Sequence, residues 1–187
     1  MWIIFGVFWM ASQSNLIVHS SGSNPVTYQL DECTNDSALA QECNKDRLVA
    51  VLRTPRRLTG IGTSDESIVA YCQQEALPLL TTDWRLPGNE AASLSRANPG
   101  IVVVRSDSPR TMTTVIIMSV LSSFKSSVVN WHTLRLRNSI VELWPYGVYI
   151  RRAENSQVVD LKYLDFSEQN WQDTFVEIVR ANYSRAD

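Results

Sequence analysis

The feature that most constrains this chain is a regular alternation between short apolar runs and longer segments with helical spacing. The clearest run, residues 100–105 (GIVVVR), is continuously apolar, as is typical of a strand buried on both faces of a sheet. The runs that predict strands are 26–30, 47–52, 77–81 and 100–105, and the segments that predict helices are 35–45, 63–76 and 110–125. Strands that alternate with helices in this way predict an α/β fold with a mainly parallel sheet.

The strongest local signal in the chain is a helix start at Thr63. Thr63 and Glu66 have the spacing of a capping box, in which the N-cap hydroxyl and the carboxylate three residues later each accept a backbone N–H bond. Apolar residues follow at helical spacing. Glu66 therefore has a structural explanation that needs no ligand. Asp65 has one too, because an acid near a helix N-terminus gains about 0.3–1 kcal/mol from the helix dipole.

The C-terminal part of the chain follows a different pattern. Residues 139–144 and 147–151 are rich in β-formers and flank Pro145-Tyr146, which predicts a hairpin at the edge of the sheet. Over 153–187 we expect an extension that contains an amphipathic helix. Its apolar stripe consists of Trp171, Phe175, Ile178 and Val179. Such a stripe must be covered, either by the domain itself or by a partner.

Residues 1–25 are interpreted as an extension outside the core. The apolar start of the chain, residues 1–10, is shorter than the roughly 20 apolar residues that span a bilayer, and it lacks the basic region of a secretory signal. We therefore expect no stable membrane insertion. The predicted organisation is an extension over 1–25, an α/β domain over 26–152 and a helical segment over 153–187.

Composition and motifs exclude several classes of protein. The 187 residues are 44% hydrophobic, which is typical of a globular chain, and the net charge of −2 gives no general attraction to nucleic acid or anionic lipid. The three cysteines Cys33, Cys43 and Cys72 cannot all pair and have no zinc-site spacing, so a reducing, cytoplasmic location is expected. No phosphate-binding glycine motif occurs. With two histidines in the chain, nucleophilic catalysis of the Ser-His or Cys-His kind is not expected.

Acidic residues follow two of the predicted strands and begin the helix between them. Asp31 follows the first strand, Asp83 follows the third, and Asp65 and Glu66 begin the intervening helix. Ligands of an open parallel sheet bind outside the carboxyl ends of its strands, so Asp31 and Asp83 would share a crevice if these two strands are neighbours. Clustered carboxylates repel one another, and a hard cation such as Mg²⁺ or Mn²⁺ relieves that repulsion. Each acid has a second interpretation, as a turn or capping residue.

Candidate groups for binding RNA lie beside these acids. Arg53, Arg56 and Arg57 lie in one loop, where they either follow a phosphate backbone or form a solvated surface. Trp84, next to Asp83, is either a core residue or a platform on which a base stacks.

Four segments in order carry a family resemblance. They are 30–33 (LDEC), 62–68 (GTSDESI), 80–86 (LTTDWRL) and 100–105 (GIVVVR). Together they resemble the PIN-like domain family, in particular short stand-alone bacterial members related to VapC-type toxins. The family pattern is roughly LDEN, GxSDEEI, a strand ending in TxDxDF, and PGVIxLR. The resemblance covers about residues 26–152.

The resemblance implies a three-layer α/β/α fold and a metal-dependent ribonuclease site. By matching position, it implies Asp31 and Asp83, with Asp65 or Glu66 as the acid at the helix start, as the ligands of a Mg²⁺ or Mn²⁺ ion. The catalytic residues expected from it are Asp31, Asp65 and Asp83. Two positions depart from the pattern. Arg85 replaces a second acid, which would weaken a second metal site, and Cys33 replaces an asparagine.

The function expected from these observations is that of a metal-dependent endoribonuclease, of the kind that forms the toxin of a toxin–antitoxin pair. Its expected partners are RNA and either an antitoxin-like protein or a second copy of the chain. The alternative is a non-catalytic PIN-like module that binds RNA or protein, and Arg85 supports it. A receiver-like phosphoacceptor domain would need a lysine after a late strand, whereas Lys125 falls at the end of a predicted helix.

Overall fold

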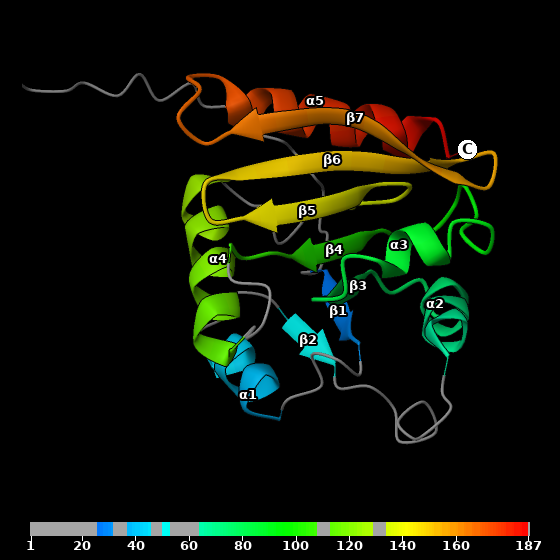
Figure 1. Cartoon of the computed structure of the whole chain (residues 1–187), viewed down its shortest axis with the longest axis horizontal. Coiled ribbons are helices and arrows are strands. Elements are labelled where there is room, and N and C mark those ends of the chain that lie inside the picture. Colours follow the sequence, from blue (N-terminus) through cyan, green and yellow to red (C-terminus); the bar gives the residue numbers. More distant parts are fainter. Residues whose placement is uncertain are drawn as a thin grey trace, which may run out of the picture.

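A computed structural model describes residues 26–31, 37–45, 50–52, 64–107, 113–128 and 134–186, and every structural statement below concerns these ranges. The elements, in chain order, are β1 (Thr27–Leu30), α1 (Ser37–Lys45), β2 (Ala50–Leu52), α2 (Asp65–Gln74), β3 (Leu79–Thr81), α3 (Leu86–Asn89), β4 (Ile101–Val104), α4 (Thr114–Ser127), β5 (Ile140–Trp144), β6 (Gly147–Glu154), β7 (Gln157–Asp165) and α5 (Trp171–Ser184) (Figure 1). The predicted extension over 1–25 lies outside the described residues.

One seven-stranded sheet organises these elements, in the order β2-β1-β3-β4-β5-β6-β7 (Figure 1). The pairings from β2 across to β5 are all parallel, and β6 and β7 are added in antiparallel fashion. The prediction of an α/β fold with a mainly parallel sheet is therefore confirmed. The antiparallel hairpin predicted around Pro145-Tyr146 forms between β5 and β6, with Trp144 paired to Gly147.

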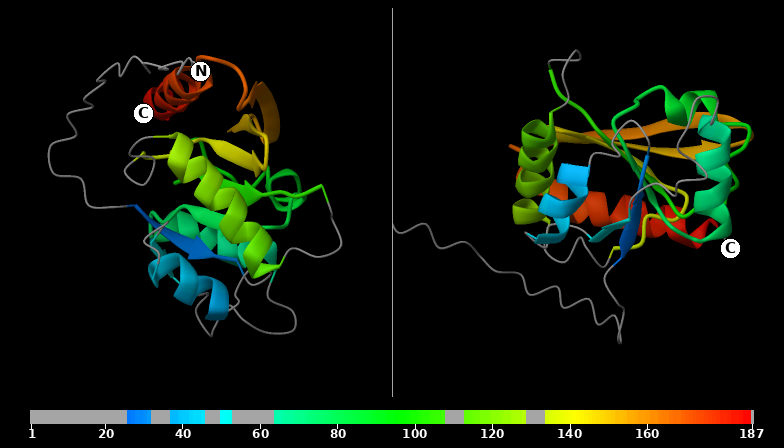
Figure 2. Two further views of the ribbon diagram at one scale, coloured as in Figure 1. Left: turned by 90° about the vertical axis from the view of Figure 1, so that its left-hand side faces the viewer. Right: turned by 90° about the horizontal axis from the view of Figure 1, so that it is seen from below.

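Helices pack on both faces of the sheet, and the two faces differ (Figure 2). The face that we call the α4 face packs against α1, α4 and α5 and forms the larger apolar core. The opposite face, the α2 face, packs against α2 and α3 and forms a smaller core around β3 and β4. Fully buried β4 contributes to both, because Val102 and Val104 point to one core and Ile101 and Val103 to the other.

Four aromatic rings join α4 to α5 in the core of the α4 face. The ring of Phe124 meets Phe175 edge to face at 5.3 Å between centroids, and it lies 6.2 Å from Trp171. Phe166, just after β7, lies 4.5 Å from Trp171. Val179 is also fully buried here. The apolar stripe of the C-terminal helix is therefore covered by the chain's own sheet and by α4.

On the α2 face, cover is confined to one part of the sheet. Ile68, Val69 and Cys72 of α2 pack over the beginnings of β3 and β4. Ile140 at the start of β5, Ala153 near the end of β6 and Val158 in β7 belong to the same core. The rest of this face over β5, β6 and β7 carries polar and aromatic side chains instead. These side chains are Glu142, Trp144, Tyr149, Arg151 and Tyr163.

The start of α2 differs by one residue from the prediction. Its N-cap is Ser64, whose hydroxyl accepts the N–H of Ser67 at 3.4 Å, whereas Thr63 lies outside the described residues. The residue at the third helical position is therefore Ser67, and the capping-box role predicted for Glu66 is wrong. Glu66 is instead exposed, one position nearer the helix start.

The sheet extends further than predicted at its antiparallel side. β6 continues to Glu154, and β7 follows where the sequence predicted only a helical extension. β7 takes the edge position, so the β5–β6 hairpin is internal. Most of β7 is half-buried or exposed, and this pattern gives a weak strand signal in sequence.

Two smaller differences concern helices. The helix predicted over 110–125 begins at Thr114, after the N-cap Thr113. The short helix α3 lies between β3 and β4, where no helix is predicted. None of the helices in the described ranges has the length and apolar character needed to cross a bilayer.

Candidate functional site

Two of the predicted acids, Asp31 and Asp83, follow strands that meet where the strand order changes direction. From β1 the chain passes to β2 on one side, and from β3 it passes to β4 on the other, although β1 and β3 are paired. In doubly wound sheets this switch point leaves a crevice outside the carboxyl ends of the two strands. Asp31 directly follows β1, and Asp83 follows the end of β3 by two residues. The adjacency of the first and third strands, on which the predicted site depends, is therefore present.

A single hydroxyl connects the two strand ends. Thr81 Oγ1 donates to Asp31 Oδ2 at 2.7 Å and accepts the backbone N–H of Asp83 at 2.9 Å. Asp83 Oδ1 in turn accepts the backbone N–H of Arg85 at 2.8 Å. Asp31 and Thr81 are both almost fully buried. Sequence analysis missed Thr81, although its place just before Asp83 at the end of a strand could have indicated a supporting role.

The start of α2 brings a second group of carboxylates to the same edge. Burial, and then the negative charge of Asp83, raise the pKa of Asp65 above its ordinary value. Burial, followed by the charges of Asp65 and Glu66, likewise raises the pKa of Glu90. Asp65 and Asp83 therefore lie within electrostatic range of each other. Glu90 follows α3 in a segment with no strand or helix periodicity, so no sequence pattern marks it as a site residue.

Cys72 lies beneath the edge, on the buried side of α2. Burial raises the pKa of its thiol to about 12, and the charge of Asp31 adds to the effect. A thiol with such a pKa is protonated at neutral pH and is a poor nucleophile. Cysteine chemistry is therefore not what this edge of the sheet supports.

The carboxylates at this edge fit one kind of divalent-cation site and not another. Within the described ranges, no three His, Cys, Asp or Glu side chains lie together in the way that an all-protein metal site needs. Mg²⁺ usually needs less, because it binds through one or two carboxylates, keeps several waters and takes further ligands from substrate phosphates. The mutual repulsion of Asp65 and Asp83 is what such a cation would relieve. This pair fits a Mg²⁺ or Mn²⁺ ion of that kind, with Asp31 held next to it by Thr81.

The predicted RNA-binding residues have different outcomes. Arg53, Arg56 and Arg57 lie outside the described residues. Trp84 is not a core residue, because half of its side chain is exposed. The guanidinium of Arg85, the next residue in the chain, lies 5.3 Å from the centre of its ring.

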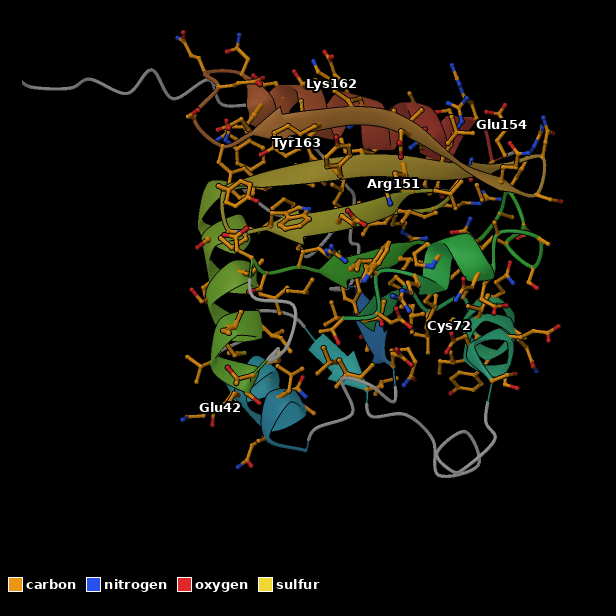
Figure 3. The ribbon with its side chains drawn as sticks, viewed as in Figure 1. Glu42, Cys72, Arg151, Glu154, Lys162 and Tyr163 are labelled. Atoms are coloured by element: carbon orange, nitrogen blue, oxygen red, sulfur yellow. The ribbon has the colours of Figure 1, made fainter. Side chains whose placement is uncertain are left out.

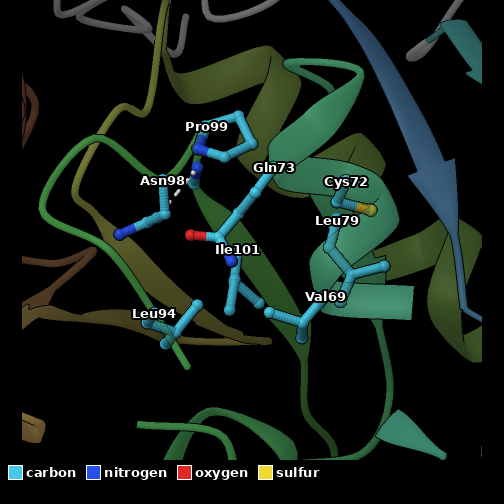
Figure 4. Close-up of a pocket in the computed structure, with 9 residues that line it drawn as sticks. Val69, Cys72, Gln73, Leu79, Leu94, Asn98, Pro99 and Ile101 are labelled. Atoms are coloured by element: carbon cyan, nitrogen blue, oxygen red, sulfur yellow. Dashed lines mark hydrogen bonds between the residues drawn. The ribbon is translucent and has the colours of Figure 1, made fainter. Parts of the chain in front are cut away.

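A pocket occurs at the opposite, amino end of β3 and β4 (Figure 4). Its free volume is about 10 Å³, which is room for roughly one water molecule. Gln73 reaches from α2 into its wall, where it accepts the N–H of Ser95 at 2.9 Å and donates to the carbonyl of Ser93 at 3.0 Å. These bonds fasten the loop before β4 to α2. The pocket is too small for a substrate, so the carboxyl edge is the better candidate.

Comparison with known proteins identifies no relative: no family model, no curated protein and no solved structure matches the chain. The resemblance to PIN-like domains therefore rests on the four sequence segments alone.

Proposed function

We propose that the protein is a Mg²⁺- or Mn²⁺-dependent endoribonuclease of the PIN-like type. The observation that carries this proposal is the link that Thr81 makes between the Asp31 carboxylate and the backbone N–H of Asp83 at neighbouring strand ends, with Asp65 within electrostatic range of Asp83. This is the edge at which α/β sheets bind their ligands. Carboxylate oxygens are also the ligands that Mg²⁺ prefers.

In this proposal each residue of the edge has a separate task. Asp65 and Asp83 would bind the ion, which, when bound, neutralises phosphate charge and makes water a stronger nucleophile. Thr81 positions Asp31 and Asp83 relative to each other through its two hydrogen bonds. The RNA phosphate would complete the ligands of the ion.

Cleavage of a fluorescently labelled single-stranded RNA tests the proposal. Wild type is expected to cleave in Mn²⁺ and not in EDTA, and Asp83→Asn should lose at least about 10-fold of the rate, as is usual when groups around a metal are altered. Glu177→Gln is the matched control, because Glu177 is an exposed carboxylate on α5, on the opposite side of the sheet. Equal cleavage by wild type and Asp83→Asn would refute the assigned site.

A second candidate function is a non-catalytic PIN-like module that binds RNA. Two observations favour it: no three-carboxylate group occurs within the described ranges, and Arg85 stands where the family pattern has a second acid. Calorimetric titration with Mn²⁺ separates the candidates. Binding that is lost in Asp65→Asn supports the nuclease, whereas no heat of binding at millimolar Mn²⁺ supports the module.

An antitoxin-like partner or a second copy of the chain is also part of the proposal. The apolar stripe of α5 no longer supports it, because Trp171, Phe175 and Val179 are buried within the chain. Size-exclusion chromatography with light scattering tests the second copy directly.

A further inference from the structure

The uncovered part of the α2 face carries a continuous row of rings and guanidinium groups. We call it the aromatic strip, and it consists of Trp84, Arg105, Trp144, Tyr146, Tyr149 and Tyr163. It begins after β3, crosses the ends of β4 and β5, and continues over β6 and β7. Its first residue is the neighbour of Asp83.

Arg105 joins the first two rings of the strip. Its guanidinium carbon lies 5.0 Å from the ring centre of Trp84 and 4.8 Å from that of Trp144. The ring of Tyr146 lies 5.9 Å beyond Trp144. These side chains come from residues 84, 105, 144 and 146, and they meet because β3, β4 and β5 are parallel neighbours that end at one edge.

The strip continues because position 147 has no side chain. Gly147 is paired with Trp144, and a Cβ at Gly147 would lie 2.6 Å from Tyr163 Cζ, so the phenol of Tyr163 occupies this place. The rings of Tyr163 and Tyr149 lie 5.0 Å apart as a cross-strand pair. Figure 3 shows Tyr163 and Arg151 on the β6–β7 part of the sheet.

The rings of the strip are accessible. Trp84 is 50% exposed and Tyr146 47% exposed, whereas Trp144, Tyr149 and Tyr163 are half-buried. Soluble proteins rarely expose large contiguous apolar patches, and where such patches occur they commonly mark binding sites. The strip is therefore a candidate contact surface.

The charges along the strip indicate the kind of ligand. Arg151 is neutralised, with ion pairs of 3.1 Å to Glu142 and 2.7 Å to Asp160. Arg85 and Arg105 differ, because neither forms an ion pair with any residue of the described ranges. Nε of Arg105 and Nε1 of Trp144 are also buried there without a hydrogen-bond acceptor. Two cations that have no carboxylate partner among the described residues, set among exposed rings, complement an anion that carries flat groups.

We propose that the aromatic strip binds single-stranded RNA, with unpaired bases stacked on its rings and phosphates next to Arg85 and Arg105. Sheet surfaces bearing aromatic rings bind unpaired bases in this way, and each stacked base contributes about 1–3 kcal/mol. A duplex fits less well because its bases are already stacked on one another. The inference rests on the proposed function and extends it, since a strand bound along the strip reaches the carboxylates at Trp84.

Fluorescence anisotropy with a labelled ten-nucleotide single-stranded RNA, in EDTA, tests the strip without cleavage. Trp84→Ala should weaken binding about 5- to 150-fold, the equivalent of 1–3 kcal/mol for one lost stacking contact. Trp84→Phe, which keeps a ring, should recover most of the affinity. Tyr183→Ala is the matched control, because it removes another ring in contact with an arginine, Arg137 at 5.6 Å, on α5.

Three results would contradict the proposal that the aromatic strip binds single-stranded RNA. They are no binding by wild type, equal binding by Trp84→Ala with its fold intact by circular dichroism, or equal affinity for the same sequence as a duplex. In the first case a protein ligand would become the better occupant.

The outcome also separates this inference from the nuclease proposal. If RNA binds the strip but no divalent metal supports cleavage, the nuclease fails and the strip stands. If Asp83→Asn abolishes cleavage while Trp84→Ala changes neither binding nor cleavage, the nuclease proposal is supported and the proposal that the strip binds RNA is wrong.

Discussion

The two faces of the sheet are built from the same strands but differ in what covers them. The α4 face is apolar from β1 to β7 and packs against α1, α4 and α5. The α2 face is apolar where α2 and α3 pack, a core that includes Ile140, Ala153 and Val158, and it bears rings, arginines and carboxylates over the rest of β5, β6 and β7.

The connections between strands explain the difference. Parallel neighbours need a crossover, and the crossovers place helices on the sheet. β5, β6 and β7 are antiparallel neighbours joined by short turns, so no helix is required between them. The single helix that follows, α5, packs on the α4 face. The α4 face therefore holds the larger buried core, whereas part of the α2 face over β5, β6 and β7 stays uncovered by helices of the described residues.

The largest expected effect is on the α4 face. Phe124→Ala removes a buried ring that contacts three other rings, and it should lower the free energy of unfolding by about 3–5 kcal/mol. Trp84→Ala, on the α2 face, should cost less than about 1 kcal/mol because the side chain is half exposed. Urea denaturation measures both. Similar losses of unfolding free energy in the two variants would contradict the expectation that the α4 face contributes more to stability.

A glycine before β4 should show the next largest effect. Gly100 has φ of +110°, and a Cβ there would lie 2.6 Å from both Cβ and the carbonyl oxygen of Leu136. Because backbone atoms cannot move aside easily, Gly100→Ala should cost about 2–3 kcal/mol. Gly88→Ala is the control, since no atom lies within 4 Å of a Cβ at that position. Thermal melting that ranks Gly88→Ala as the less stable variant would contradict this.

Gly147→Ala should have a smaller effect on stability and a specific effect on binding. The atoms in the way belong to the ring of Tyr163, which can turn aside, so the loss should be about 1 kcal/mol. The displaced ring would interrupt the aromatic strip, and affinity for single-stranded RNA should fall more than stability does. Unchanged affinity would show that binding does not use the β6–β7 part of the α2 face.

The smallest expected effect is on the ionisation of Asp65 at the carboxyl edge of the sheet and on the pH dependence of stability that follows from it. Because the pKa of Asp65 is raised, its ionisation opposes folding, and its contribution to stability decreases as the pH rises above the ordinary value of 3.8. Asp83→Asn removes one cause, so the pKa of Asp65 should fall. NMR titration of the carboxyl carbons measures this.

The same titration contains its own control. Hydrogen bonds from the hydroxyl and amide of Ser167 lower the pKa of Asp165, so its contribution has the opposite sign and is lost as the pH falls. Asp165 should not respond to Asp83→Asn. An unchanged pKa of Asp65 in that variant would mean that the two carboxylates do not interact.

Periodicity predicted the α/β class because apolar runs and helical spacing are local properties. The adjacent hydroxyls of Thr63 and Ser64 are equally good caps, so local sequence could not decide between them. β7 was missed because an edge strand buries few side chains and owes its structure to pairing with β6.

The site was predictable only in part for a related reason. Asp31 and Asp83 are marked in sequence by the strands they follow, but their proximity depends on strand order, which is not local. Thr81 and Glu90 acquire their roles only once these elements meet. Trp84 was recognised as a possible platform, whereas Arg105, Trp144 and Tyr163 join it only in three dimensions.

The ring cluster around Phe124 has a consequence for biosynthesis. Trp171 and Phe175, which cover this ring, are made about fifty residues after it. A nascent chain therefore carries an uncovered apolar surface on α4 until α5 has left the ribosome. During translation this protein should be a client of chaperones that shield such surfaces, and its final folding step should be the docking of α5.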